Sequence, residues 1–282
     1  MRYLEPKTLD EALAILSSED DARALAGGAT LVAMMNADLV APEVLVGLRR
    51  ITSLRGITET TGGLRIGAMT THNEISGDSR LSGAMAVVKS AASQIAHDAI
   101  RDVGTIGGAL SHGDPNADFP SAVTAADASI EIASAEGIRS VPADDFFVDY
   151  LETVLAPGEL VTAVNIPFGP ASAWGHYLKF SRADGDYATV SVALVLGLNH
   201  GRCDYARFAV GACGPRPIRV EPAEDRLIGS ELVIDDVAAA GEMLAAAADP
   251  VDDVRGSSEY RQLLIPRLLA RAIIIAKEHI NG

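Results

Sequence analysis

The sequence predicts an α+β fold in three successive units, and three observations support this prediction. Up to Pro170, short strand-like stretches alternate with stretches whose apolar residues have helical spacing. After Pro170 the pattern changes to three longer strand-like stretches, as in an antiparallel sheet. From Val233 onward the spacing is again helical. We therefore expect units at residues 1–55, 56–170 and 171–282.

In the first unit, strands and helices are predicted to alternate in a βαβ-like order. Thr8 and Glu11 fit a capping box at a helix start, and the apolar residues that follow lie on one helix face. A strand that ends at Gly27-Gly28 comes next. The expected elements are strands at 1–6, 22–28 and 43–48 and helices at 8–16 and 29–36.

The second unit starts with a strand after a Gly-Gly turn. Thr71 and Glu74 repeat the capping-box pattern and open a short helix. The stretch from Arg101 to Ala117 is expected to be a loop that interrupts two helices. The other expected elements are strands at 63–69, 128–134 and 159–168 and helices at 83–99 and 119–128.

The third unit is predicted to be an antiparallel sheet followed by helices. His200-Gly201 is a plausible hairpin turn. Pro266 should kink or offset the last helix, because proline has no amide hydrogen and clashes with the preceding turn. The expected elements are strands at 176–182, 189–199 and 203–214 and helices at 233–248 and 257–280.

Composition excludes several classes of partner. The 23 basic and 38 acidic residues give a net charge of −15, which argues against binding to nucleic acid or to an anionic membrane surface. No apolar run is long enough for a membrane helix, and the N-terminal stretch lacks the apolar segment of a signal peptide. Cys203 and Cys213 cannot supply four thiolates for an iron–sulfur cluster or a zinc site, and they are expected to be reduced thiols. We expect a cytoplasmic protein.

Two glycine pairs carry the functional signal. One lies in Ala26–Thr30, after a strand and before a helix, and the other in Thr105–Gly108. Glycine lets a ligand approach the backbone, and free amides at a helix start can hold an anion without a cationic side chain. Taken alone, each pair is more often an ordinary tight turn.

The known phosphate motifs are missing. No G-x-x-x-x-G-K-[ST] is present, and no G-x-G-x-x-G follows the first strand. Two separate loops could instead close on one pyrophosphate from opposite sides. An extended dinucleotide held by backbone amides is therefore the predicted ligand.

Catalytic and metal-binding side chains are not expected in this chain. His97 and His112 have no nucleophile pattern around them and no metal-ligand spacing such as H-E-x-x-H. His97 is expected to be structural, whereas His112 is close in sequence to the second glycine pair. Asp184 and Asp186, near Arg182, are expected to form a surface turn.

Seven stretches in order resemble one known family: "ALAGGATLVAMM", "PEVLVGLRRI", "LRIGAMTTHNEI", "IRDVGTIGGALSHGDPNADFP", "LVTAVNIP", "KFSRADGDYATVSVAL" and "SSEYRQLLIPRLLARA". Together they resemble the medium, FAD-binding subunits of the molybdenum hydroxylases, which include carbon monoxide dehydrogenase and the bacterial xanthine-dehydrogenase-like enzymes. The resemblance covers essentially the whole chain. It implies a two-part FAD-binding domain of the PCMH type, followed by a C-terminal domain of antiparallel strands packed with helices.

The resemblance also implies a non-covalent FAD and a set of residues around it. The first glycine loop would hold the pyrophosphate, and the second would meet the pyrophosphate and flavin from the second unit. These residues are Leu25, Ala26, Gly27, Gly28, Ala29, Thr30, Leu31, Thr105, Ile106, Gly107, Gly108, Ala109 and His112. Ala29 and Ala109 depart from the polar residues of some relatives, which removes side-chain hydrogen bonds but no backbone amide.

Four more residues take roles from the resemblance. Asp118 would accept hydrogen bonds from ribose hydroxyls, although helix N-cap is an equally good reading. Lys179 would be near the flavin, and without the resemblance it would be an exposed strand lysine. Tyr187 would lie against the isoalloxazine, or else be a core or edge-strand tyrosine. Val161 would touch the edge of the adenine or flavin.

The implied function is electron transfer. A large partner subunit would hold the molybdenum cofactor, a small one the [2Fe–2S] clusters, and the complex would be a dimer of heterotrimers. FAD in this chain would pass electrons to NAD⁺, oxygen or a quinone. Two alternatives stay open: a free-standing FAD-dependent oxidoreductase of the same fold superfamily, and a nucleotide-binding module without redox activity.

Overall fold

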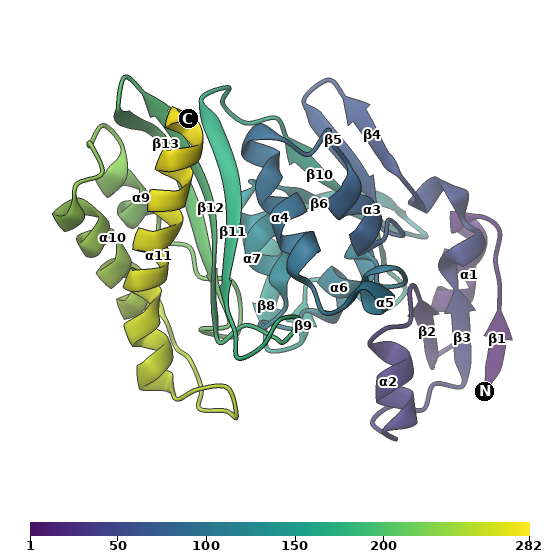
Figure 1. Cartoon of the computed structure of the whole chain (residues 1–282). Helices are drawn as coiled ribbons and strands as arrows, with labels where there is room; N and C mark the ends of the chain where they lie inside the picture. The colour runs from purple at the N-terminus through teal and green to yellow at the C-terminus, as the bar shows by residue number, and fades with distance from the viewer.

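The computed structural model describes residues 1–282, and its first unit is a small parallel sheet flanked by helices (Figure 1). The strand order is β1-β3-β2, and Val44 in the central strand pairs with both Arg2 and Ala22. The predicted alternation of strands and helices is confirmed, and the side chain of Thr8 caps the first helix. The elements are β1 (Arg2–Leu4), α1 (Leu9–Ser18), β2 (Ala22–Leu25), α2 (Leu31–Asn36), β3 (Val44–Gly47) and the 3-10 turns Leu48–Arg50 and Thr52–Leu54.

A five-stranded antiparallel sheet forms the second unit, in the order β4-β5-β10-β6-β7. Its helices pack on the sheet and share a core of 32 buried residues. Its strands are β4 (Ile57–Thr60), β5 (Gly63–Gly67), β6 (Ser129–Ser134), β7 (Gly137–Pro142) and β10 (Leu160–Pro167), beside a hairpin of β8 (Phe147–Asp149) and β9 (Glu152–Thr153). Its helices are α3 (His72–Gly77), the 3-10 turn Gly83–Met85, α4 (Ala86–Gln94), α5 (Asp98–Arg101), α6 (Ile106–His112), α7 (Asp118–Ala125) and α8 (Ala143–Phe146).

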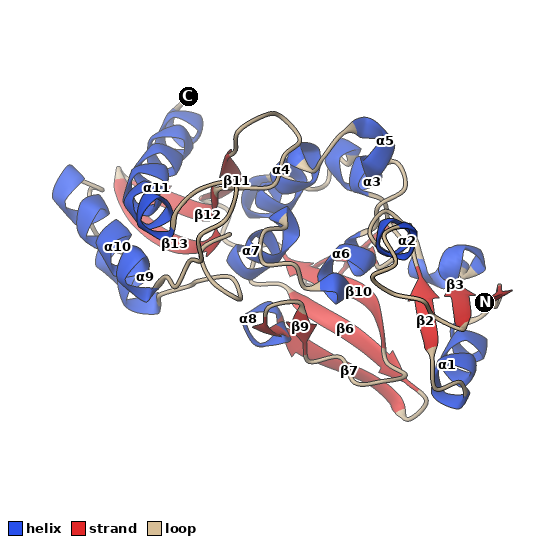
Figure 2. Ribbon diagram, turned by 90° about the horizontal axis from the view of Figure 1, so that it is seen from below, coloured by secondary structure: helices blue, strands red, loops and turns tan.

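The third unit is a three-stranded antiparallel sheet with helices on both faces (Figure 2). Alternate side chains of its strands point to opposite faces, so Tyr177 and Ala193 join the core under α4 and α7. Val192 and Leu194 join a second core with α10 and α11. The elements are β11 (Ala173–Phe180), β12 (Val190–Asn199), β13 (Arg202–Gly211), α9 (Glu221–Leu227), α10 (Ile234–Ala247) and α11 (Ser258–Asn281).

The three sheets fall within the three ranges expected from the sequence, although the boundaries themselves stay a prediction. Helices α4 and α7 of the second unit pack on β11 and β13, so the third sheet has no free face. None of the helices is both long and apolar enough to cross a membrane. Cys203 and Cys213 are buried free thiols, as expected.

The predicted helix over 83–99 is correct for α4 (Ala86–Gln94) but wrong beyond it, because the helix ends after Gln94. Ile95 is extended and Ala96 has a φ of +41°, which interrupts the helical ladder. The guanidinium of Arg101 donates to the carbonyl oxygens of Ile95 and Ala96, at 2.8 and 3.0 Å. A side chain five residues farther along the chain therefore stabilises the break.

The predicted loop over 101–117 is also wrong in part, because it contains α6. Thr105 caps this helix through its hydroxyl, and Ile106 and Leu110 are fully buried. The last helix, α11, spans Ser258–Asn281 with Pro266 inside it, as the predicted helix over 257–280 requires, while the predicted kink stays a prediction. Helices α10 and α11 pack closely at this proline, and Gly241 of α10 allows it, because a Cβ on Gly241 would lie only 2.6 Å from the Cα of Pro266.

Candidate functional site

The first glycine loop, Ala26–Thr30, joins β2 to α2 and presents a row of unused amides. No hydrogen bond in the structure has the backbone amide of any residue from Ala26 to Leu31 as its donor. Gly28 has a φ of +81°, a conformation that L side chains rarely adopt. The residues of the loop are half-buried, apart from Thr30, which is exposed. Six consecutive backbone donors therefore have no partner within the chain, which suits a loop that binds an anion.

The second glycine pair differs from the expectation, because its amides are already used. Ile106 donates to the carbonyl of Thr70 at 3.1 Å, and Gly107 to that of Ala68 at 2.9 Å. The amides of Gly108 and Ala109 donate to the hydroxyl and the carbonyl of Thr105, at 3.2 and 3.0 Å. This pair can shape a site by close packing, but it has no free donor for a pyrophosphate.

The two loops lie against each other at the seam of the first and second units. A Cβ built on Gly108 would lie 3.5 Å from the Cβ of Ala26. A Cβ on Gly27 would lie only 1.7 Å from the carbonyl oxygen of Val103, so any side chain at position 27 would push the units apart. Packing thus accounts for Gly27, while backbone conformation accounts for Gly28.

Asp118, the first residue of α7, forms a buried ion pair with Lys179 of β11. Their side chains are 7% and 4% exposed, and the Lys179 ammonium lies 3.1 Å from Oδ1 of Asp118. The hydroxyl of Tyr177 donates to the same oxygen at 2.6 Å, and Lys179 also donates to the carbonyl of Gln94 at 2.7 Å. Burial raises the pKa of the Asp118 carboxyl, and the nearby Lys179 charge opposes this effect.

Two of the alternative readings are therefore wrong. Ala117, not Asp118, is the N-cap of α7, and no side chain caps that helix. Lys179 is a buried lysine, not an exposed one. The contact of Asp118 with a ribose stays a prediction, but the carboxylate is turned toward Tyr177 and Lys179 inside the protein.

Tyr187 is 44% exposed in the loop that joins β11 and β12. The Arg255 guanidinium lies 5.2 Å from the centre of its ring and 3.3 Å from the carboxylate of Asp186. Partial burial raises the pKa of Tyr187, and the charge of Asp114 adds to the shift. Arg182 donates to the carbonyl of Val254 instead of pairing with the nearby aspartates. No sequence signal pointed to Arg255, because it is 68 positions from Tyr187.

The remaining predicted residues have more ordinary surroundings. His112 ends α6 and is half-buried, and Leu25 ends β2 and is half-buried. Val161 is 4% exposed in the core of the second sheet, and its contact with FAD stays a prediction. His97 packs against the β11–β12 loop, since a Cβ on Gly185 would lie 2.7 Å from the His97 ring, which agrees with a structural role.

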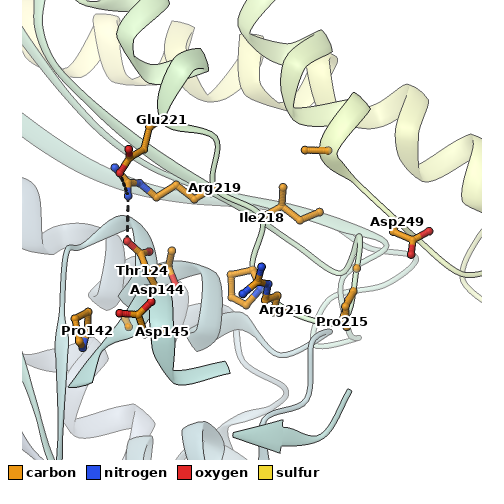
Figure 3. A pocket seen from close by; sticks show the side chains of 14 residues that line it. Thr124, Pro142, Asp144, Asp145, Pro215, Arg216, Ile218, Arg219, Glu221 and Asp249 are labelled. Atoms are coloured by element: carbon orange, nitrogen blue, oxygen red, sulfur yellow. Dashed lines mark hydrogen bonds and ion pairs between the residues drawn. The ribbon is translucent and has the colours of Figure 1, made fainter. Parts of the chain in front are cut away.

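A pocket of about 780 Å³ lies elsewhere, between the α7–α8 region and residues 214–221 (Figure 3). Its most prominent feature is the ion pair of Arg219 and Asp144, at 3.0 Å. Arg219 also pairs with Glu224 at 2.7 Å. None of its lining residues is a predicted site residue, and its Arg219 contacts tie the second and third units together.

Two family models match the chain. The FAD binding domain of molybdopterin dehydrogenase matches residues 1–169, and the C-terminal domain of the carbon monoxide dehydrogenase flavoprotein matches residues 175–276. The nicotine 6-hydroxylase medium subunit of Paenarthrobacter nicotinovorans is 36% identical over 98% of this chain and 97% of its own. The carbon monoxide dehydrogenase medium chain of Afipia carboxidovorans is 37% identical over 98% of this chain and 96% of its own.

The solved structures agree with these matches. A chain of carbon monoxide dehydrogenase from Hydrogenophaga pseudoflava superimposes with a TM-score of 0.95 at 34% identity, covering 99% of this chain and 97% of that one. The resemblance stated from the sequence and its fold are thereby confirmed. The chain belongs to the FAD-binding medium subunits of the molybdenum-containing dehydrogenases and hydroxylases, a family of oxidoreductases.

Proposed function

We propose that this chain is the electron-transfer subunit of a molybdenum-containing hydroxylase or dehydrogenase. In this proposal it holds one FAD without a covalent bond, receives electrons from [2Fe–2S] clusters of a small partner subunit, and passes them to an external acceptor. A large partner subunit holds the molybdenum cofactor and oxidises the substrate. The observation that carries the proposal is the row of unpaired amides from Ala26 to Leu31 in a matched FAD-binding domain.

The amide row suits a pyrophosphate in a chain of net charge −15. Backbone amides hold an anion by hydrogen bonds and oriented dipoles, so they need no lysine or arginine in the loop. Gly28 gives the turn its left-handed φ, and the start of α6 closes the loop from the second unit. FAD supplies the redox chemistry, and the residues of this chain bind and orient it.

The number and state of the cysteines indicate that the iron–sulfur clusters are held by another subunit. A [2Fe–2S] cluster is usually held by four thiolates, and this chain has two cysteines. Burial raises the pKa of Cys203 to about 11 and that of Cys213 to about 12, so both stay protonated thiols at neutral pH. The clusters are therefore assigned to a partner. The proposed assembly, a cytoplasmic dimer of heterotrimers, is the one that the resemblance to the family implies.

Two measurements test the proposal. The purified chain is denatured in acid, and FAD, not FMN, is expected in the supernatant at one equivalent per chain. Purification from the native host should also recover a large chain and a small iron–sulfur chain. Flavin that stays on the pellet contradicts the non-covalent site, and a lone chain that turns over its own substrate supports the free-standing oxidoreductase instead.

A further inference from the structure

We propose that the pocket between the α7–α8 region and residues 214–221 binds a primary ammonium group, carried by a small alkylamine or by a lysine side chain of a partner chain. The inference goes beyond the proposed function, because the pocket shares no residue with the two glycine loops. Its volume of about 780 Å³ is within the usual range for sites that bind small molecules (Figure 3).

Two buried oxygen atoms of residues that line the pocket have no hydrogen-bond partner. They are Oγ1 of Thr124, a residue that is only 2% exposed, and Oδ1 of Asp144. The two residues are neighbours, because Arg207 donates to the carbonyl of Thr124 at 3.0 Å and to Oδ2 of Asp144 at 2.8 Å. Buried oxygens without a donor are costly and uncommon, so this wall of the pocket suits a ligand that brings N–H donors.

The charges around these oxygens favour a cation. Four acidic and two basic side chains line the pocket. Arg219 is already paired with Asp144 and with two glutamates of its own segment. Asp145 and Asp249 are exposed and have no ion pair, and the exposed Arg216 is the one unpaired basic side chain beside them. The unpaired charges are therefore negative on balance, and a cationic ligand neutralises them.

The number of unused acceptors matches a primary ammonium, which has three donors. Figure 3 shows Thr124, Asp144 and Asp145 together at one end of the pocket, with Asp249 at the other end. The first three residues supply three acceptors that the chain leaves without a partner: a hydroxyl, one carboxylate oxygen and a whole carboxylate. A quaternary ammonium has the charge but no donor, and an anion adds negative charge beside the carboxylates.

The wall formed by residues 214–218 suits a short alkyl chain. Pro215, Pro217 and Ile218 line it. Proline fixes its own φ, so this wall loses little conformational freedom when a ligand binds.

The two unpaired oxygens lie just below the surface of the pocket, where solvent does not reach them. The side chain of Asp144 is 32% exposed, so we expect its carboxylate to turn as the ammonium enters. Arg219 keeps its ion pair with Glu224, at 2.7 Å, when this happens.

The experiment compares the binding of butylammonium and tetramethylammonium to the full-length chain by isothermal titration calorimetry. The two ions have the same atoms and the same charge, but only butylammonium has N–H donors. Butylammonium is expected to bind with a dissociation constant at least fivefold lower. Equal binding of both ions means that the net charge of −15 attracts any cation, and it overturns the inference, as does no binding of butylammonium at millimolar concentrations.

Thr124→Val tests the buried hydroxyl. Because this hydroxyl has no partner in the chain, valine should leave the free energy of unfolding unchanged or raise it, while butylammonium binding weakens about tenfold. Thr162→Val is the matched control, since the buried hydroxyl of Thr162 donates to Glu131 at 2.6 Å. This control should lose stability and keep the amine affinity. Loss of stability in Thr124→Val, or an unchanged amine affinity, overturns the site.

Asp145→Asn tests the exposed carboxylate, and a last comparison identifies the source of the ammonium. Asp145→Asn should weaken butylammonium binding without loss of stability, and wild-type affinity in this variant contradicts the three-acceptor arrangement. If the natural ligand is a free amine, butylammonium binds equally to the isolated chain and to the complex purified from the native host. If a partner's lysine fills the pocket, butylammonium binds only to the isolated chain. The FAD content, measured separately, tests the proposed function independently of these results.

Discussion

Replacing Gly28 by alanine tests whether the amide row binds the pyrophosphate. Gly28 has a φ of +81°, and an L residue in this conformation costs about 1–2 kcal/mol. The only hydrogen bond at Gly28 runs from the Val32 amide to its carbonyl, at 3.0 Å, and none holds the amides of the loop, so we expect the free chain to relax to a negative φ at this position. Binding must then restore the strained conformation, and the FAD dissociation constant should rise about 5- to 30-fold.

The assay is thermal unfolding with and without FAD, with Gly229→Ala as the matched control. Gly229 has a φ of +78° with nothing within 4 Å of its Cβ position, and its amide is held by the carbonyl of Cys203 at 2.7 Å. At 100 times the wild-type dissociation constant, FAD stabilises the wild-type chain by about 2.7 kcal/mol. The same FAD concentration should stabilise Gly28→Ala by only about 0.9–1.8 kcal/mol.

One variant should lose stability without ligand, and the other should lose the stabilisation that FAD provides. Gly229→Ala should melt roughly 2–8 °C lower without ligand and keep the full stabilisation by FAD. Gly28→Ala should melt close to the wild type without ligand and lose much of the stabilisation. If Gly28→Ala binds FAD like the wild type, the loop is only a turn and the amide row has another role.

Three further outcomes follow from the structure. Arg255→Met should keep FAD but change the rate of flavin reoxidation by about two- to fivefold in stopped-flow measurements, because the cation over Tyr187 is worth about 0.5–1 kcal/mol; an unchanged rate with every acceptor would mean that the contact does not position the ring. Cys203 and Cys213 should react with a thiol reagent only after unfolding, since both are buried with raised pKa values, and fast labelling of the native chain would contradict this. Burial lowers the pKa of His72 from 6.5 to about 4, so between these pH values the unfolded chain binds more protons than the folded chain. The free energy of unfolding should therefore drop by about 3 kcal/mol as the pH falls from 6.5 to 4. Urea unfolding should show a smaller drop over this pH range in His72→Gln.

Sequence periodicity predicted most elements of this fold, because most of them follow local patterns. The capping box at Thr71 and Glu74 is present, and the His200-Gly201 turn joins two strands as expected. The failures were elements fixed by distant contacts. Helix α6 has only seven residues, two of them glycine, and isolated helices of this length are unstable. Its cap and its buried face hold it in place.

The contacts in the candidate site were also hard to predict from local sequence patterns. The glycine loops could be found as motifs, but only the structure shows that one has free amides and the other does not. Asp118 and Lys179 could be named from the resemblance, yet their pairing joins positions 61 apart, and Tyr177 gave no local signal. Arg255 and Tyr187, which also contact each other, are similarly far apart in the sequence. The contact of Tyr177 and Lys179 with Asp118 depends on how the third sheet packs on α4 and α7, which no sequence window contains.

The proposed site draws on all three units, and this has a consequence for how FAD would act on the fold. The amide row comes from the first sheet, α6 from the second unit, and Lys179 and Tyr187 from the third sheet and its loop. The first two units meet through a glycine contact that tolerates no side chain, at Gly27 and Val103. A ligand that bridges such units binds only when they are correctly packed, so its binding free energy adds to the stability of that arrangement. FAD would therefore order the seam between the units as well as supply the redox centre.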